Sequence, residues 1–257
     1  MSGGWAVRLS GDDWSLQGLG LWFAQKRCKV SREEDGSYYL TSPDLVPCNT
    51  EDAAWEVAVR IVSHINSAAK VLNQGQFPVH AAALIRTEPD GTRRSSVRAS
   101  VSAHAIIRDR WSAEVVRDGE VVAPSSPSLA ERIVRLQERE GAASPVARAL
   151  AQWNLPEQTP TSLNNILEII RDDVSGDDPD RGRTWGTMVG AMAPLMAMRE
   201  GQLDDELRRC RDSLHDPTTV GPLARHGSPR HVANPMDMEQ AKDFVHRLLL
   251  AWLRGKI

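Results

Sequence analysis

The sequence has few cysteines, and their placement argues against stabilisation of the fold by disulfides or by a zinc ion. Three occur among 257 residues, at Cys28, Cys48 and Cys210, and no two stand at the short spacing of a zinc-binding pair. Such wide spacing argues against a structural metal ion or a disulfide framework and fits a reducing compartment. We therefore expect a cytoplasmic protein.

A leader sequence and long apolar segments are also missing. The first residues, MSGGWAVRLSGDDW, contain neither a basic start nor an apolar core, so no signal peptide is predicted. The most apolar run, residues 186 to 198, is interrupted by Pro194. It is shorter than the roughly 20 residues that a helix needs to cross a bilayer, and we expect no membrane contact.

The familiar motifs of nucleotide-binding and hydrolytic enzymes are absent. The glycines stand singly in turns, and neither a GxSxG nor an HExxH pattern occurs. The acidic segment 172 to 180 lacks the ligand spacing of a calcium loop. The formal charge is −3, so no net basic excess indicates nucleic-acid binding. We predict no cofactor and no metal ion.

The first 124 residues have the pattern of strands around one helix. Asp35-Gly36 stands between two short extended runs, which is a hairpin signal. From Thr50, a plausible N-cap, the period changes to that of a helix ending near Asn73. Further extended runs are predicted at 5 to 10, 79 to 86, 96 to 107 and 111 to 117. The pattern predicts a small antiparallel β-meander with one packed helix.

A Pro- and Ser-rich stretch, APSSPS at 123 to 128, marks the best domain boundary. Beyond it the periodicity is helical, with segments predicted to begin near Ser128, Pro145, Thr161 or Ser162, residue 184 and residue 237. Such a succession is typical of a helical bundle. The predicted fold is α+β, with a β-rich accessory domain at 1–124 and an all-α bundle at 125–257.

Most of the seven histidines stand alone in the sequence. His64 falls on the predicted helix, and His80 and His104 fall on predicted strands. These three are better explained as structural than as catalytic residues, because no partner is visible beside them. His246 is predicted on the surface of the last helix and His215 in a loop after the long helical region.

The segment from Arg225 to His231 differs, because it places two Arg-His pairs within seven residues ahead of a helix. Imidazoles exchange protons near neutral pH, guanidiniums bind phosphate, and the helix dipole attracts anions. Such a set has the chemistry to hold a phosphodiester and to move a proton to or from its 2′-hydroxyl or 5′-oxygen. Metal-independent RNA cleavage requires both. The alternative is a hydrophilic loop with a turn at Pro229.

This segment resembles a known family. Arg225-x5-His231 fits the R-x4-6-H motif of the HEPN superfamily, in which a polar residue follows the Arg, as His226 does here. An amphipathic helix follows the motif, as it does in that family. The resemblance covers residues 128–257 and implies a HEPN-like bundle, while the β-rich first half has no counterpart in it.

The resemblance also implies roles for individual residues. The site residues it implies are catalytic Arg225, His226 and His231, phosphate-binding Arg225 and Arg230, and supporting Glu168 and Arg171. Glu168 and Arg171 approximate an acidic and basic pair that lies upstream of the motif in the family, but they are spaced three apart instead of four. Pro229 and Pro235 also depart from the pattern, because they prevent one regular helix from carrying both ends of the motif.

Three hypotheses for the function stay open. The leading one is a metal-independent endoribonuclease of a bacterial defence or toxin system, acting on RNA and dimeric as is usual in that family. The second is a non-catalytic HEPN-like binding or assembly module that acts with a protein partner. The third is a sensor of nucleotides or small anions that uses the Arg/His segment.

Two further stretches each have two interpretations. The run GTMVGAMAPLMAM, 186 to 198, is rich in small residues and Met, which suit core packing or a dimer interface. An arginine-rich hairpin in the first domain forms either a solvated sheet face or a basic surface for RNA. Its arginines are Arg93, Arg94, Arg98, Arg108 and Arg110.

Overall fold

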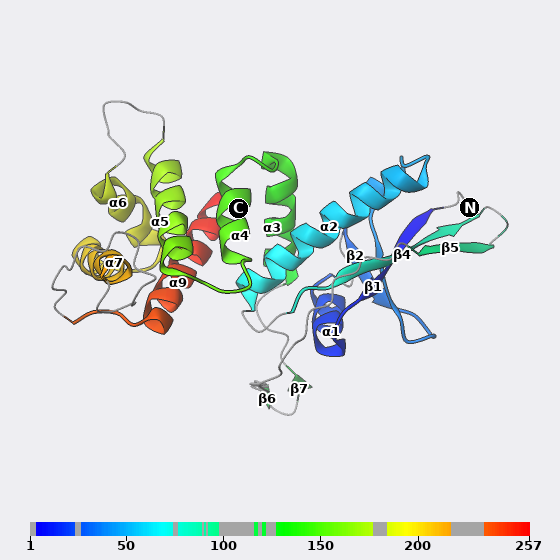
Figure 1. The fold of residues 1–257 in the computed structure, drawn as a ribbon, viewed down its shortest axis with the longest axis horizontal. Helices are drawn as coiled ribbons and strands as arrows, with labels where there is room; N and C mark the ends of the chain where they lie inside the picture. Colours follow the sequence, from blue (N-terminus) through cyan, green and yellow to red (C-terminus); the bar gives the residue numbers. More distant parts are fainter. Residues whose placement is uncertain are drawn as a thin grey trace. The chain divides into compact units, whose positions relative to one another are not determined.

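The computed structural model (Figure 1) describes residues 4–23, 27–73, 77–88, 90, 92–97, 116–117, 120–121, 127–176, 184–216 and 234–257. Contacts divide the chain into two compact units, residues 1–134 and 135–257, and each is described by itself. A five-stranded antiparallel sheet with helices is followed by an all-helical region, which confirms the predicted α+β class. The boundary predicted between 124 and 125 lies outside the described residues and stays a prediction.

The sheet of the first unit has the strand order β2-β3-β1-β4-β5, so the first strand in the sequence is the central one. The elements of this unit are β1 (Trp5–Ser10), α1 (Asp13–Trp22), β2 (Lys29–Arg32), β3 (Tyr38–Thr41), the 3-10 turn η1 (Pro43–Leu45), α2 (Glu51–Leu72), β4 (His80–Thr87) and β5 (Arg93–Val97). A separate two-stranded pairing joins β6 (Val116–Arg117) to β7 (Glu120–Val121). Most of the strands predicted over 96 to 107 and 111 to 117 falls outside the described residues.

The hairpin between β2 and β3 forms at Asp35-Gly36, as predicted. Gly36 has a φ of +79°, a conformation that glycine adopts without steric penalty. The Asp35 carboxylate accepts a hydrogen bond from the Ser37 backbone N–H at 2.8 Å, and this contact lowers the pKa of the carboxyl below its ordinary value. The turn therefore has the local chemistry that its sequence indicates.

Helix α2 confirms the predicted helix of the first domain and packs against β4 (Figure 1). The Thr50 side chain caps it by accepting a hydrogen bond from the Ala53 N–H at 3.2 Å. Helix α1 is additional to the prediction, because two glycines weaken its intrinsic helix propensity. Burial stabilises it, and its buried side chains are Ser15, Leu16, Leu19 and Trp22.

Asn66 of α2 holds the chain that leads into β4. Its Nδ2 donates to the Val79 carbonyl at 2.8 Å, and its Oδ1 accepts from the Val79 N–H at 2.9 Å. Val79 is only 1% exposed, so water does not readily replace these bonds. One side chain thus satisfies both backbone groups of a buried residue that lies just outside the sheet ladder.

We predict that Asn66→Ala lowers the free energy of unfolding by about 2 to 4 kcal/mol, because it leaves two buried backbone groups unpaired. Denaturant unfolding of the full chain measures this change. Asn49→Ala is the matched control, since Asn49 is exposed and precedes the same helix. Equal effects of the two substitutions would contradict the assignment of a clamp to Asn66.

The second unit is helical throughout its described residues, as predicted. Its helices are α3 (Pro127–Glu140, whose first half belongs to the first unit), α4 (Pro145–Trp153), α5 (Pro160–Ser175), α6 (Trp185–Leu195), α7 (Glu200–His215) and α9 (Met238–Lys256). Helix α5 contacts α4, α6, α7 and α9, which makes it the central helix of this unit. Its core side chains are Leu163, Ile166, Leu167 and Ile170.

Two helix ends differ from the sequence-based expectation. Helix α5 is capped by Thr159, whose side chain accepts from the Ser162 N–H at 3.1 Å while the Ser162 hydroxyl accepts from the Thr159 N–H. The prediction of Thr161 or Ser162 as the cap was wrong, because Pro160 suits the first helical position and the residue before it, Thr159, becomes the cap. Ser162 still takes part, as the third residue of a capping box.

The helical region predicted from 184 to 213 is divided into α6 and α7. Ala197, with a φ of +52°, reverses the chain, and the Met198 N–H donates to the Ala193 carbonyl at 3.0 Å. This arrangement is a helix C-cap of the Schellman type. The periodicity alone did not show the break, because both sides of it are amphipathic or apolar.

Within the described part of the chain, no helix combines the length and the apolar character that a membrane crossing requires.

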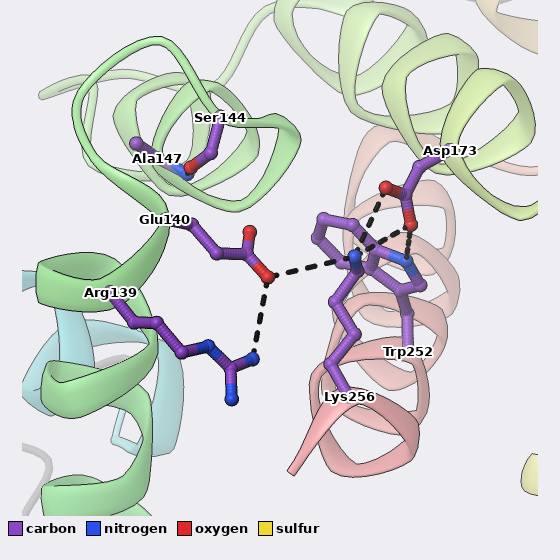
Figure 2. A network of polar contacts seen from close by, with 7 residues as sticks. All are labelled: Arg139, Glu140, Ser144, Ala147, Asp173, Trp252 and Lys256. Carbon is purple, nitrogen blue, oxygen red and sulfur yellow. Dashed lines mark hydrogen bonds and ion pairs between the residues drawn. The ribbon is translucent and has the colours of Figure 1, made fainter.

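A polar network links α3, α5 and α9 (Figure 2). The Trp252 indole N–H donates to the Asp173 carboxylate at 2.9 Å, and the Lys256 ammonium lies 3.0 Å from the same carboxylate. Glu140 at the end of α3 lies 3.9 Å from the same ammonium. Asp173 is only 16% exposed in its side chain, so these partners stabilise a charge that is largely removed from water. The network fixes the end of α9 against the central helix.

We predict that Asp173→Ala lowers the free energy of unfolding by about 2 to 3 kcal/mol, because the Trp252 N–H loses its acceptor and the Lys256 ammonium loses the nearer of its two carboxylates. Asp173→Asn keeps an acceptor for the indole and is expected to cost about 1 kcal/mol. Asp205→Asn, at an exposed position of α7, is the control. A finding that the alanine and asparagine variants unfold alike would show that the indole bond contributes nothing.

Candidate functional site

The Arg/His segment identified in the sequence lies in the interval 217–233, which is outside the described residues. This applies to Arg225, His226, Arg230 and His231, so their predicted roles stay predictions. The supporting residues Glu168 and Arg171 are described, and both lie half-buried on the central helix α5. The site is therefore built here from the elements on either side of the segment.

The two ends of this interval meet in the structure. The Met236 N–H, just before α9, donates to the Ser213 hydroxyl in the last turn of α7 at 2.8 Å. Ser213 is fully buried and Met236 is 3% exposed, so the bond lies inside the unit. The described residues on either side of the interval thus lie side by side at the end of α7. Asp237 then caps α9 in a capping box with Gln240.

Helices α5 and α7 carry a row of polar side chains that begins at this junction. Asn164, Glu168 and Arg171 follow one another at helical spacing on α5, and Arg211 and His215 do so on α7. We call these five residues the polar seam. Its two helices contact each other, and the His215 Nε2 lies 3.2 Å from the Asn164 Oδ1. The seam therefore begins in the last turn of α7, directly before the interval that contains the Arg/His segment.

Trp185, the first residue of α6, contacts the two arginines at the other end of the seam. The guanidinium of Arg171 lies 4.8 Å from the centroid of the indole ring, and that of Arg211 lies 3.9 Å from it. Arg171 also donates to the Asp172 carboxylate through Nε at 2.8 Å and through a terminal nitrogen at 2.6 Å. Indole faces attract guanidiniums, so one aromatic ring holds cations from two helices.

The seam contains the functional groups that phosphoryl chemistry uses. It offers an imidazole, a carboxylate, an amide and two guanidiniums within one helix pair. No group of three or more potential metal ligands occurs among the described residues. Burial raises the pKa of the neighbouring Cys210 thiol to about 12, so this cysteine stays neutral and is not a nucleophile. The seam is suited to acid/base and electrostatic chemistry.

The other described histidines lie apart from the seam. His246 of α9 is half-buried and stacks on Trp153 with ring centroids 5.0 Å apart and an angle of 8° between the planes, so it packs on the bundle and is not fully at its surface. Burial, aided by the charge of Arg60, lowers the pKa of His64 in the first unit. His80 is exposed on β4.

His215 and Asn164 were missed by the sequence reasoning. His215 was expected in a loop, but it is the last residue of α7 and contacts a side chain that is 1% exposed. A signal was present in the buried face of α5, where Asn164 interrupts a run of apolar residues. Sequence alone could not identify its partner, which lies 51 positions away.

The apolar run and the arginine-rich hairpin, which each had two interpretations, can be compared with the structure where their residues are described. Met188, Val189 and Met192 of α6 are buried in the second unit, which favours core packing for that part of the apolar run. In the arginine-rich hairpin, Arg93 donates to the Glu33 carboxylate at 2.6 and 3.2 Å. Arg94 lies 3.7 Å from Glu88. Arg98, Arg108 and Arg110 are outside the described residues.

Comparison with known proteins found no match to any family, any curated protein or any solved structure.

We predict that Trp185→Leu lowers the free energy of unfolding by about 1 to 2 kcal/mol, because two guanidiniums lose the face of the indole. Trp185→Phe, which keeps a weaker aromatic face, is expected to fall between the wild type and the leucine variant. Thermal or denaturant unfolding measures both. If the leucine and phenylalanine variants are equally stable, Trp185 acts only as apolar filling.

Proposed function

We propose that the protein is a metal-independent endoribonuclease whose site is formed by the Arg/His segment and the polar seam. In this proposal Arg225 and Arg230 bind the scissile phosphate, His231 is the general acid/base, and His226 assists it. Glu168 and Arg171 support the segment from the central helix. The resemblance to the HEPN superfamily assigns the protein to a cytoplasmic bacterial defence or toxin system and to a dimeric state.

The junction between α7 and α9 carries this proposal. The hydrogen bond from the Met236 N–H to the Ser213 hydroxyl joins the described residues on either side of the interval that contains the Arg/His segment, at the end of α7 where the seam begins. A capped helix, α9, follows directly. An R-x4-6-H motif at the head of the last helix of a bundle is the arrangement that the family resemblance leads one to expect.

The proposed chemistry needs no cofactor. The base removes the proton of the 2′-hydroxyl as this oxygen attacks phosphorus. The electron pair of the breaking P–O5′ bond goes to the 5′-oxygen, which the acid form of the general acid/base protonates. The guanidiniums stabilise the additional negative charge on the phosphoryl oxygens in the transition state. The products are a 2′,3′-cyclic phosphate and a 5′-hydroxyl end, and no water or metal ion takes part in this step.

A second candidate is a non-catalytic binding or assembly module acting with a protein partner. Two apolar side chains of the helical unit favour it, since Leu155 is 40% exposed and Leu195 is 48% exposed. Exposed apolar groups of this size are common on monomers as well as at interfaces. The ribonuclease is therefore the first proposal, and the module is the outcome if cleavage is absent.

We predict that the purified full chain cleaves RNA in EDTA and that His231→Ala and Arg225→Ala each reduce the rate by about 100-fold or more, as expected for acid/base and oxyanion-stabilising groups. Gel analysis of a labelled oligonucleotide measures the rate, and the cyclic phosphate end identifies the mechanism.

Two matched variants separate the site from a contaminating nuclease. His80→Ala changes an exposed histidine of β4, and Arg208→Ala changes an arginine of α7 that is 62% exposed. Both are expected to cleave at the wild-type rate. Equal activity in all four variants would identify a contaminant, and no activity in the wild type together with a stoichiometric protein partner would favour the binding module.

A further inference from the structure

The sheet of the first unit ends at β5, and one side of this strand has no partner strand among the described residues (Figure 1). In the turn that leads into β5, the Glu88 N–H donates to the Thr92 carbonyl at 2.8 Å, which marks a hydrogen-bonded pair. Hydrogen-bonded and non-hydrogen-bonded pairs alternate along an antiparallel ladder. The register of β4 and β5 therefore directs the main-chain groups of Arg93, Ser95 and Val97 away from β4.

These outward groups are accessible to another strand. Arg93, Ser95 and Val97 are all exposed, and the exposed fraction of Val97 is 67%. A row of such N–H and C=O groups is a template for a further strand unless proline, a bulge or charge blocks it. The described strand has no proline and no shift in its register with β4. Its two arginines lie 2.6 and 3.7 Å from carboxylates of the same unit, so their charges are partly balanced.

The opposite edge of the sheet, β2, is closed by the protein itself. The Val30 N–H donates to the Phe23 carbonyl at 3.0 Å, outside the ladder with β3. Val30 is 1% exposed, so this bond is buried. The two edges of the described sheet therefore differ, and β5 is the one that presents a row of main-chain groups to solvent.

A second copy of β5 fits this edge in an antiparallel register that keeps the arginines apart. A two-fold axis at Ser95 places the two Ser95 residues opposite each other and Arg93 opposite Val97 of the second copy. Arg94 then faces Ser96. All the outward residues form hydrogen-bonded pairs in this register, and each pair exchanges two main-chain bonds. An axis at Arg94 would instead place like charges directly opposite each other, which is destabilising.

We propose that two copies of this chain pair through β5, antiparallel about Ser95, so that their two sheets become one continuous sheet. A closed two-fold dimer is the commonest form of homo-oligomer. The aliphatic stem of Arg93 covers the exposed Val97 of the second copy in this arrangement. The inference concerns the first unit and does not rest on cleavage of RNA. It places the interface of the dimer in the β-rich part of the chain.

Ser95→Pro is the decisive variant. It removes an N–H that points away from β4, so the ladder between β4 and β5 keeps its hydrogen bonds while the edge can no longer pair. In sedimentation equilibrium of the full chain, we expect the wild type to pass from the mass of one chain to that of two as its concentration rises. Ser95→Pro should keep the mass of one chain and an unchanged circular dichroism spectrum. Ser95→Ala retains the N–H and should dimerise as the wild type does.

Val97→Arg and Val97→Glu test the register. Residue 97 faces Arg93 of the second copy twice in the symmetric dimer, so Val97→Arg adds two like-charge pairs and Val97→Glu adds two opposite-charge pairs. We expect the dissociation constant to rise about 2- to 30-fold for Val97→Arg and to fall by a similar factor for Val97→Glu. The matched controls are Val59→Arg and Val59→Glu on α2, where the side chain is 47% exposed and outside the proposed interface.

Amide hydrogen exchange followed by NMR reads the pairing residue by residue. The N–H groups of Arg93, Ser95 and Val97 should exchange more slowly as the protein concentration rises, because the dimer occupies them. Those of Arg94 and Ser96 already belong to the ladder with β4 and should change little. An alternating pattern identifies pairing at this edge, whereas a dimer formed through another surface would not produce it.

Each outcome decides the inference separately from the proposed function. A wild type with the mass of one chain at every concentration would overturn it. A dimer that responds neither to Ser95→Pro nor to the sign of the charge at Val97 would also overturn it, since the interface would lie elsewhere. If Ser95→Pro does not fold, the two Val97 variants and the exchange pattern decide. RNA cleavage in EDTA is measured independently, so neither result changes the other.

Discussion

Helix α5 is packed against four other helices, so polar side chains on its buried faces are largely removed from water and are stabilised by partners inside the unit. Three of its polar side chains have such partners. Asn164 pairs with His215, Arg171 with Asp172 and Trp185, and Asp173 with Trp252 and Lys256. Apolar packing brings α5 into the centre of the unit, and these polar contacts then specify which neighbouring helix meets which part of it.

The buried end of α7 shows the same requirement. Ser213 is buried in the last turn of α7, and its hydroxyl accepts a hydrogen bond from the Met236 N–H. That bond joins the two described ends of the interval that contains the Arg/His segment, on the helix that carries Arg211 and His215 of the polar seam. The proposed function rests on this junction and on the chemistry of the seam.

Much of the fold could be predicted because its signals are local. The Asp35-Gly36 turn, the Thr50 cap and the amphipathic period of α2 all act within a few residues, and each is confirmed. Helix α1 could not be predicted, since its glycines oppose helix formation and its stability comes from burial. The division between α6 and α7 was also missed, because Ala197 adopts a left-handed conformation that its residue type does not favour.

The α+β class, the succession of a β-rich half and a helical half, and the concentration of functional groups in the Arg/His segment all follow from the amino-acid sequence. The central place of β1 in the sheet and the contact of Asn164 with His215 follow only from the packing of the folded chain. The difference arises from distance along the chain. Turns, caps and helical periods arise from neighbouring residues, whereas strand order and buried polar pairs depend on which distant surfaces pack together.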